Sequence, residues 1–316
     1  LEKRGNRLGQ QLAFRFPKDV RKGDPRAEED LAHGYSIMAA DSIKVVSKGP
    51  LVGSLRTKGR LLDVHGKTVA KFVQTHTVRR ASRVLEIEVE LDPIRMPEGN
   101  PWDCYFGWRF AWGSELVDVF RDVHSGSVGV DVDCIESPRF IEVQCPGTLT
   151  SPATSTTFLT DGSPFHRRFD FRRMDTPLIV QGETGRSFRI GVALDVQNPL
   201  QAAVEFISPE PPMSENVIAP RTPFAWLRHI DVRNLHVTDQ QPLFEEGRLT
   251  GVRMRLLETE GRAGETTLQF FRPVKSAVKS DFLGNELAAL ETSEGSVSIP
   301  FTGRELAEIR VDFARE

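Results

Sequence analysis

Cysteine and long apolar runs are scarce in this 316-residue chain, and each scarcity excludes a class of protein. The three cysteines, Cys104, Cys134 and Cys145, have no CxxC spacing, so the sequence indicates neither a disulfide framework nor a metal site of its own. No apolar run approaches the roughly 20 residues that cross a bilayer, so no membrane contact is expected. The formal net charge of −3, with mixed signs along the chain, argues against a nucleic-acid partner.

Strand patterns fill most of the chain, and helical periodicity is almost absent. The clearest pattern is LEIEVEL at residues 85–91, where four aliphatic residues alternate with three glutamates. Such alternation is typical of an antiparallel strand with one buried face and one solvated face. Residues 188–196 alternate in the same way and end at Asn198-Pro199. The sequence therefore predicts an all-β protein, with the first strand or a short helix within residues 6–16.

A proline-rich stretch divides the chain into two predicted domains. Residues 208–223 contain five prolines and no apolar periodicity, which is typical of a linker. We expect a large antiparallel β-sandwich in residues 1–212 and a smaller β-sandwich in residues 213–316. The second part has room for strands near residues 230–237, 250–258, 266–271, 296–301 and 308–313.

Aromatic residues are concentrated at residues 100–112, NPWDCYFGWRFAW, which hold three of the four tryptophans. Two interpretations compete: Trp108 and its neighbours form core, or some of the rings form a flat platform for a sugar. Core is favoured, because Phe106, Trp108, Phe110 and Trp112 share one face of an alternating strand. Trp102 and Tyr105 are kept as candidates for carbohydrate binding.

The candidate functional segment is residues 159–183, LTDGSPFHRRFDFRRMDTPLIVQGE, which gathers four arginines between two apolar strands. Burial of unpaired arginines costs more than packing returns, so we expect a charged loop that is neutralised by Asp161, Asp170 and Asp175. No carboxylate pair, GxSxG motif or metal-ligand spacing stands out, so no catalytic residue is predicted. His124 and the pair Ser163–His166 are weaker candidates, for which a structural role is favoured.

Several segments, in order, resemble one known family. PFHRR and RMDTPLIVQGE, with GRLLD, QTHTVRRASRVLEIEVELDP and NPWDCYFGWRFAW before them, are similar to the C-terminal β-region of glycoside hydrolase family 38 α-mannosidases. The resemblance covers about residues 5–313. In that family a catalytic barrel with a zinc ion and an aspartate nucleophile lies N-terminal to this region, and no such barrel is found in this sequence.

The resemblance implies a galactose mutarotase-like β-supersandwich followed by the smaller sandwich. It implies a non-catalytic portion of an α-mannosidase that completes the carbohydrate-binding cleft of the barrel, with His166, Arg167 and Arg168 near the substrate. This chain alone is then expected to be inactive and to hold no cofactor, since the zinc belongs to the barrel. The alternatives are a free-standing carbohydrate-binding module and a mutarotase-like enzyme. Because the chain begins without methionine, we expect a piece of a longer protein, whose compartment the sequence leaves open.

Overall fold

The computed structural model describes residues 10–17, 34–147, 152–170, 172–208 and 227–314. It divides into two compact units. The first unit contains Leu1–Val123 and Gly129–Ile207, and the second contains Ser208–Glu316 together with the short segment His124–Val128. The predicted boundary at residues 212 and 213, and most of the predicted linker, lie outside the described residues. Apart from one helix, the described elements are antiparallel strands, which confirms the all-β fold class.

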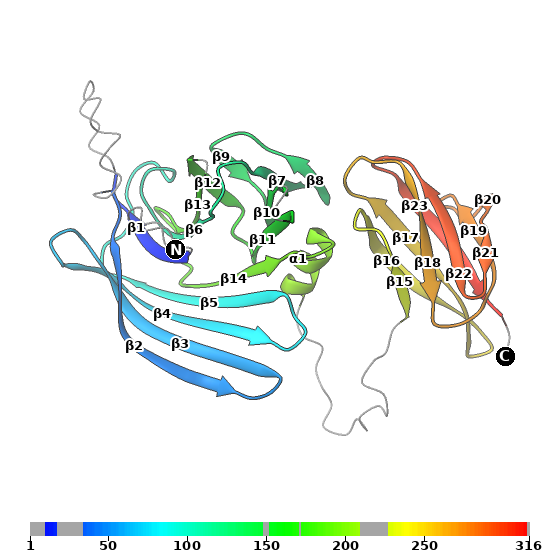
Figure 1. Ribbon diagram of the computed structural model, residues 1–316, viewed down its shortest axis with the longest axis horizontal. Helices are drawn as coiled ribbons and strands as arrows, with labels where there is room; N and C mark the ends of the chain where they lie inside the picture. Colours follow the sequence, from blue (N-terminus) through cyan, green and yellow to red (C-terminus); the bar gives the residue numbers. More distant parts are fainter. Residues whose placement is uncertain (1–9, 18–33, 148–151, 171, 209–226, 315–316) are drawn as a thin grey trace. The chain divides into compact units, whose positions relative to one another are not determined.

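Two sheets form the first unit (Figure 1). The five-stranded sheet has the order β1 (Gln10–Arg15), β6 (Tyr105–Ala111), β13 (Arg173–Ile179), β12 (Phe165–Asp170), β9 (Cys134–Glu136). The nine-stranded sheet has the order β2 (Ile37–Lys48), β3 (Val52–Leu62), β4 (Thr68–Arg79), β5 (Val84–Pro93), β14 (Ser187–Leu194), β11 (Thr154–Thr160), β10 (Phe140–Cys145), β7 (Asp118–Val123), β8 (Gly126–Gly129).

The core of the first unit lies between these two sheets. Trp108 and Phe106 of β6 point into it, whereas Phe110 and Trp112 are only partly buried against it. Their contacts confirm the expected aromatic stripe, because alternate residues of a strand share a face. Ile87 and Ile190 contribute from the opposite sheet and are fully buried. The large sandwich therefore follows directly from the alternation seen in the sequence.

Part of the nine-stranded sheet is exposed to solvent on the same face that elsewhere carries the core. Cross-strand pairing joins Val45, Leu55, His76 and Ile87 in one row, and the first two are 61% and 46% exposed while Ile87 is buried. Val78, which is paired with Leu85, is also exposed. The long strands β2–β5 that carry this row lie side by side in Figure 1. We call Ile43, Val45, Leu55 and Val78 the apolar extension of the sheet.

One helix, α1 (Pro199–Ile207), follows β14, where the sequence analysis placed only the end of a strand. The Asn198 side chain accepts a hydrogen bond from the backbone N–H of Gln201 at 3.0 Å, and Pro199 occupies the first helical position. Both are standard helix-start features. Leu200, Ala203 and Phe206 pack with Phe140 and Leu159 in a separate small core.

The second unit is a smaller sandwich of two sheets. One sheet has the order β15 (Arg228–Ile230), β18 (Gly264–Phe270), β22 (Ser296–Phe301), β21 (Thr292–Ser293). The other has the order β16 (Leu235–Glu245), β17 (Arg248–Glu258), β23 (Leu306–Phe313), β19 (Val274–Ser280), β20 (Glu286–Ala289). Four of the five expected strands are present as β17, β18, β22 and β23, and the one expected near residues 230–237 is divided into β15 and β16, which belong to different sheets. The strands β19, β20 and β21 were not predicted.

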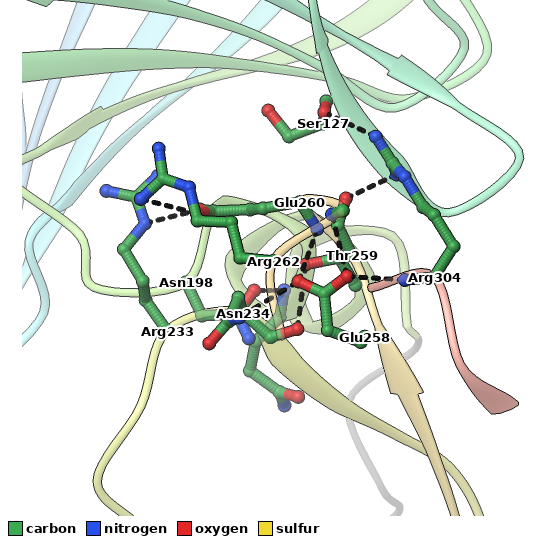
Figure 2. Close-up of polar contacts among 11 residues, drawn as sticks. Ser127, Asn198, Arg233, Asn234, Glu258, Thr259, Glu260, Arg262 and Arg304 are labelled. Carbon is green, nitrogen blue, oxygen red and sulfur yellow. Dashed lines mark hydrogen bonds and ion pairs between the residues drawn. The ribbon is translucent and has the colours of Figure 1, made fainter. Parts of the chain in front are cut away.

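A buried carboxylate organises the loops of the second unit (Figure 2). Glu258 accepts hydrogen bonds from the backbone N–H groups of Glu260, Gly261 and Arg304 and from the Asn234 amide, at 2.6–2.9 Å. Burial alone would raise the pKa of Glu258, but these donors outweigh it and hold the pKa below its usual value. The Arg304 guanidinium also donates to the backbone oxygen of Thr259.

Replacing Glu258 with Gln should lower the free energy of unfolding of the second unit by about 1–2 kcal/mol, because its neutral amide leaves backbone donors poorly satisfied. Hydrogen–deuterium exchange should show faster exchange at the N–H groups of Gly261 and Arg304. Glu286→Gln, at an exposed position of β20, is the matched control and should leave exchange unchanged. Equal exchange in the two variants would contradict this role for Glu258.

Candidate functional site

The segment at residues 159–183 forms two paired strands, β12 and β13, so the expectation of a charged loop is wrong. The register of the sheet explains how so many charges can lie in strands. Arg167 lies opposite Asp175, and Asp175 lies opposite Arg109 of β6, so one row of charges crosses three strands. These side chains lie on the face opposite the core, and the pairing supplies carboxylates at the right spacing.

We call the group on this face the outer-face cluster. It joins charged and aromatic side chains from four strands and two connecting segments. Its members are Arg15, Tyr35, Asp103, Tyr105, Arg109, Arg167, Phe169 and Asp175.

Asp175 is the buried centre of the cluster. Arg109 Nε donates to Asp175 Oδ1 at 2.8 Å and Arg109 Nη2 donates to Oδ2 at 3.2 Å, while the Tyr105 hydroxyl donates to Oδ2 at 2.9 Å. Asp175 is 2% exposed and Arg109 is 5% exposed. Burial alone would lower the pKa of Arg109, but the Asp175 carboxylate raises it above its ordinary value. Arg109 therefore stays charged, and it binds both carboxylate oxygens of Asp175 in a bidentate pair.

The ring of Tyr35 packs on this ion pair. The guanidinium carbon of Arg109 lies 3.5 Å from the centroid of the Tyr35 ring, and Arg15 Nη1 donates to the Tyr35 hydroxyl oxygen at 2.7 Å. Burial, and then the negative charge of Asp175, raise the pKa of Tyr35 to about 12. Burial likewise raises the pKa of Tyr105 well above its usual value. Both phenols are therefore neutral near pH 7 and act as hydrogen-bonding groups.

Asp103 and Arg167 form the accessible rim of the cluster. Arg167 Nη1 donates to Asp103 Oδ1 at 2.9 Å, and their side chains are 21% and 47% exposed. Arg15 Nε donates to the Asp103 backbone oxygen at 3.2 Å. The guanidinium carbons of Arg15 and Arg167 lie 4.7 and 4.9 Å from the centroid of the Phe169 ring. The rim thus presents a donor, an acceptor and an aromatic ring in fixed positions.

Two further aromatic rings lie on the same strand face. Trp102 packs edge-on against Phe165 with ring centroids 5.8 Å apart, and Phe165 is 45% exposed. Phe165, Arg167 and Phe169 alternate along β12 and share its outer face. The structure therefore brings together three sequence candidates, Trp102, Tyr105 and Arg167, although Tyr105 is buried behind the rim.

The other two candidates, His166 and Arg168, lie on the inner face of β12. His166 is fully buried; its Nδ1 lies 2.9 Å from Thr176 Oγ1 and its Nε2 lies 3.2 Å from the Ser137 backbone oxygen. Because a carbonyl only accepts, Nε2 carries the proton and Nδ1 accepts from the Thr176 hydroxyl. Burial lowers the pKa of His166 to about 4. Arg168 lies opposite Met174, on the side of the core.

Sequence reasoning missed Arg15, Tyr35, Asp103 and Arg109. One signal was available for Arg109: within YFGWRFA it alternates with the aromatic stripe, so it had to point away from the core. Nothing in the sequence pairs it with Asp175, which is 66 positions away. Among the weaker candidates, His124 lies in a turn with φ +49°, and Asp161 is exposed; the side chain of Asp170 lies outside the described residues.

Within the described residues no group of three or more histidine, cysteine, aspartate or glutamate side chains is placed to hold a metal ion. The three cysteines are free thiols. Among the helices of the described part, none is long and apolar enough to cross a membrane. The outer-face cluster can bind and orient a polar ligand, but its only buried carboxylate is committed to Arg109.

Comparison with known proteins shows the fold. No family model matches the sequence, and no curated protein matches it. Solved structures do match, among them an α-mannosidase from Enterococcus faecalis V583 (TM-score 0.56, 12% identity) and a protein of glycosyl hydrolase family 38 from Enterococcus faecalis (TM-score 0.55, 13% identity). Each covers 88% of this chain, which spans 35% and 36% of theirs. At the level of the fold, this likeness confirms the resemblance that the sequence motifs indicated.

Proposed function

We propose, from the fold shared with part of these two proteins, that this chain is a non-catalytic, β-rich portion of a family 38-type α-mannosidase. In this proposal the outer-face cluster completes the carbohydrate-binding cleft of a catalytic barrel that this sequence does not contain. The observation that carries it is the rim pair Arg167–Asp103, a donor and an acceptor held beside aromatic rings by a buried ion-pair network.

The chemistry of the rim suits a sugar. A pyranose hydroxyl both donates and accepts, so the Asp103 carboxylate and the Arg167 guanidinium can each bind one. The ring faces of Phe165 and Trp102 suit the weakly apolar C–H face of a pyranose. Arg109, Asp175 and Tyr35 would not touch the sugar; they hold the rim in place, so that little side-chain entropy is lost on binding.

The zinc ion that the resemblance implies would belong to the barrel. Within the described residues no group of side chains is placed to hold that ion, so its ligands would come from the barrel. The role of this chain is to bind and orient the substrate, while bond cleavage falls to residues outside it.

Replacing Arg167 with Ala in the full-length enzyme should lower kcat/KM by about tenfold to a hundredfold, because a donor to the substrate is lost. The folding cost should stay below about 1 kcal/mol, since the pair with Asp103 lies at the surface. Steady-state kinetics on an aryl α-mannoside, together with urea unfolding, measures both.

The matched control is Arg56→Ala, which removes an exposed arginine from β3 of the other sheet and should change neither quantity. Unchanged kinetics with a reduced melting temperature for Arg167→Ala would make the rim a purely structural clamp. A gene in which no catalytic barrel is encoded with this chain would instead favour a free-standing carbohydrate-binding module.

A further inference from the structure

The first unit contains a groove that is distinct from the outer-face cluster. Its volume is about 690 Å³, within the range of ligand sites in proteins. It brings the start of β7 and neighbouring residues of the nine-stranded sheet together with Arg168 of β12 in the five-stranded sheet. The residues that matter here are Glu115, Leu116, Val117, Val130, Asp131 and Arg168.

Arg168 reaches this groove because it follows Arg167 in a strand. Successive side chains of a strand point to opposite faces, so one arginine belongs to the outer rim and the next to the space between the sheets. The Arg168 side chain is only 12% exposed, and its Nη1 lies 3.7 Å from Asp131 Oδ1. The groove therefore has a guanidinium in its wall.

Aliphatic surface forms another part of the wall. Val117 and Val130 pack against the main core and also line the groove. Leu116 lines it as well and is 77% exposed. Together the three side chains give the wall an apolar strip that a ligand can cover.

Carboxylates complete the lining. Glu115 pairs with Arg172 at 3.1 Å and its side chain is 62% exposed, while the Asp131 side chain is fully exposed. The wall thus combines acceptors, a donor and apolar strips. The carboxylates disfavour an anionic ligand, and the guanidinium disfavours a cationic one.

We propose that this groove binds a short neutral oligosaccharide, at a site complete within this chain and separate from the outer-face cluster. The hydroxyl groups of such a ligand accept from Arg168 and donate to Asp131, while its C–H faces pack on Leu116, Val117 and Val130. The site does not depend on the α-mannosidase assignment, because every group it uses belongs to this unit.

The test uses the 316-residue chain and saturation-transfer NMR with four probes. Mannotriose and maltotriose are the neutral ligands, glucuronate is the anionic one and glucosamine the cationic one. A neutral trisaccharide should bind, and Arg168→Met should weaken its affinity at least tenfold. Arg56→Met, an exposed arginine in the other sheet, is the matched control and should leave the affinity unchanged.

A second variant guards against a folding defect. Leu116→Asp changes an exposed position, so it should fold normally and still weaken binding at least fivefold, because a charge replaces the apolar contact. The proposal is overturned if no neutral trisaccharide binds at 10-fold molar excess over about 1 mM protein. It is also overturned if Arg168→Met and Leu116→Asp bind as the unchanged chain does, or if only glucuronate or only glucosamine binds. Loss of binding here would leave the kinetic test of Arg167 untouched.

Discussion

Replacing Asp175 with Ala should lower the free energy of unfolding of the first unit by about 3–5 kcal/mol, because it leaves Arg109 buried and uncompensated. Arg109 is 5% exposed and gives two hydrogen bonds to Asp175. The same change also removes the acceptor of the Tyr105 hydroxyl. Urea unfolding followed by tryptophan fluorescence measures the effect, since Trp102, Trp108 and Trp112 belong to this unit.

Two further variants isolate the cause. Asp41→Ala breaks an exposed ion pair with Arg60 and should have little effect, because solvent screens it. The double variant Arg109→Met and Asp175→Leu replaces both buried charges with apolar side chains, and should recover most of the lost stability. If Asp175→Ala were as mild as Asp41→Ala, the outer-face cluster would not be held together by its central ion pair.

The second large effect is a loss of folding stability at acidic pH. His166 has a folded pKa of about 4, below the usual 6.5, because burial disfavours its charged form. As the pH falls below 6.5 the unfolded chain takes up a proton at this position while the folded chain does not. The contribution of His166 to stability is therefore complete above pH 6.5 and declines towards pH 4, by about 3 kcal/mol in all.

Replacing His166 with Gln should remove this pH dependence. The variant will be less stable at pH 7, since one amide cannot keep both the Thr176 and Ser137 hydrogen bonds. Its unfolding free energy should approach that of the unchanged chain as the pH falls to 4, because other titrating groups act equally on both. His65→Gln, in an exposed turn, is the matched control for the substitution itself and should cost little stability at pH 7. Parallel curves for His166→Gln would contradict the buried neutral histidine.

Local patterns predicted most of the fold. Alternation placed Phe106 and Trp108 in the core and identified the strands around residues 85–91, because a period of two depends only on neighbours along the chain. The helix α1 was not predicted, although Asn198 and Pro199 are typical of a helix start, because they were interpreted as the end of the preceding strand. A helix of nine residues offers little periodicity to outweigh that interpretation.

The candidate site was predictable only in part. Four arginines in a short stretch suggested a loop, because burying unpaired arginines would cost more than packing returns. Their strands are stable because the sheet register brings Asp103 to Arg167 and Arg109 to Asp175, across 64 and 66 positions of the sequence. The opposite directions of Arg167 and Arg168 follow from strand geometry alone, once the segment is known to be a strand.

The apolar extension of the nine-stranded sheet has a practical consequence for handling the protein. Ile43, Val45, Leu55 and Val78 form a bare aliphatic surface in the folded state. An environment-sensitive dye such as anilinonaphthalene sulfonate should therefore fluoresce on the native chain before any heating. Melting curves read from such dyes would begin at a high baseline and understate the transition, so intrinsic fluorescence or calorimetry is the suitable readout for the variants described above.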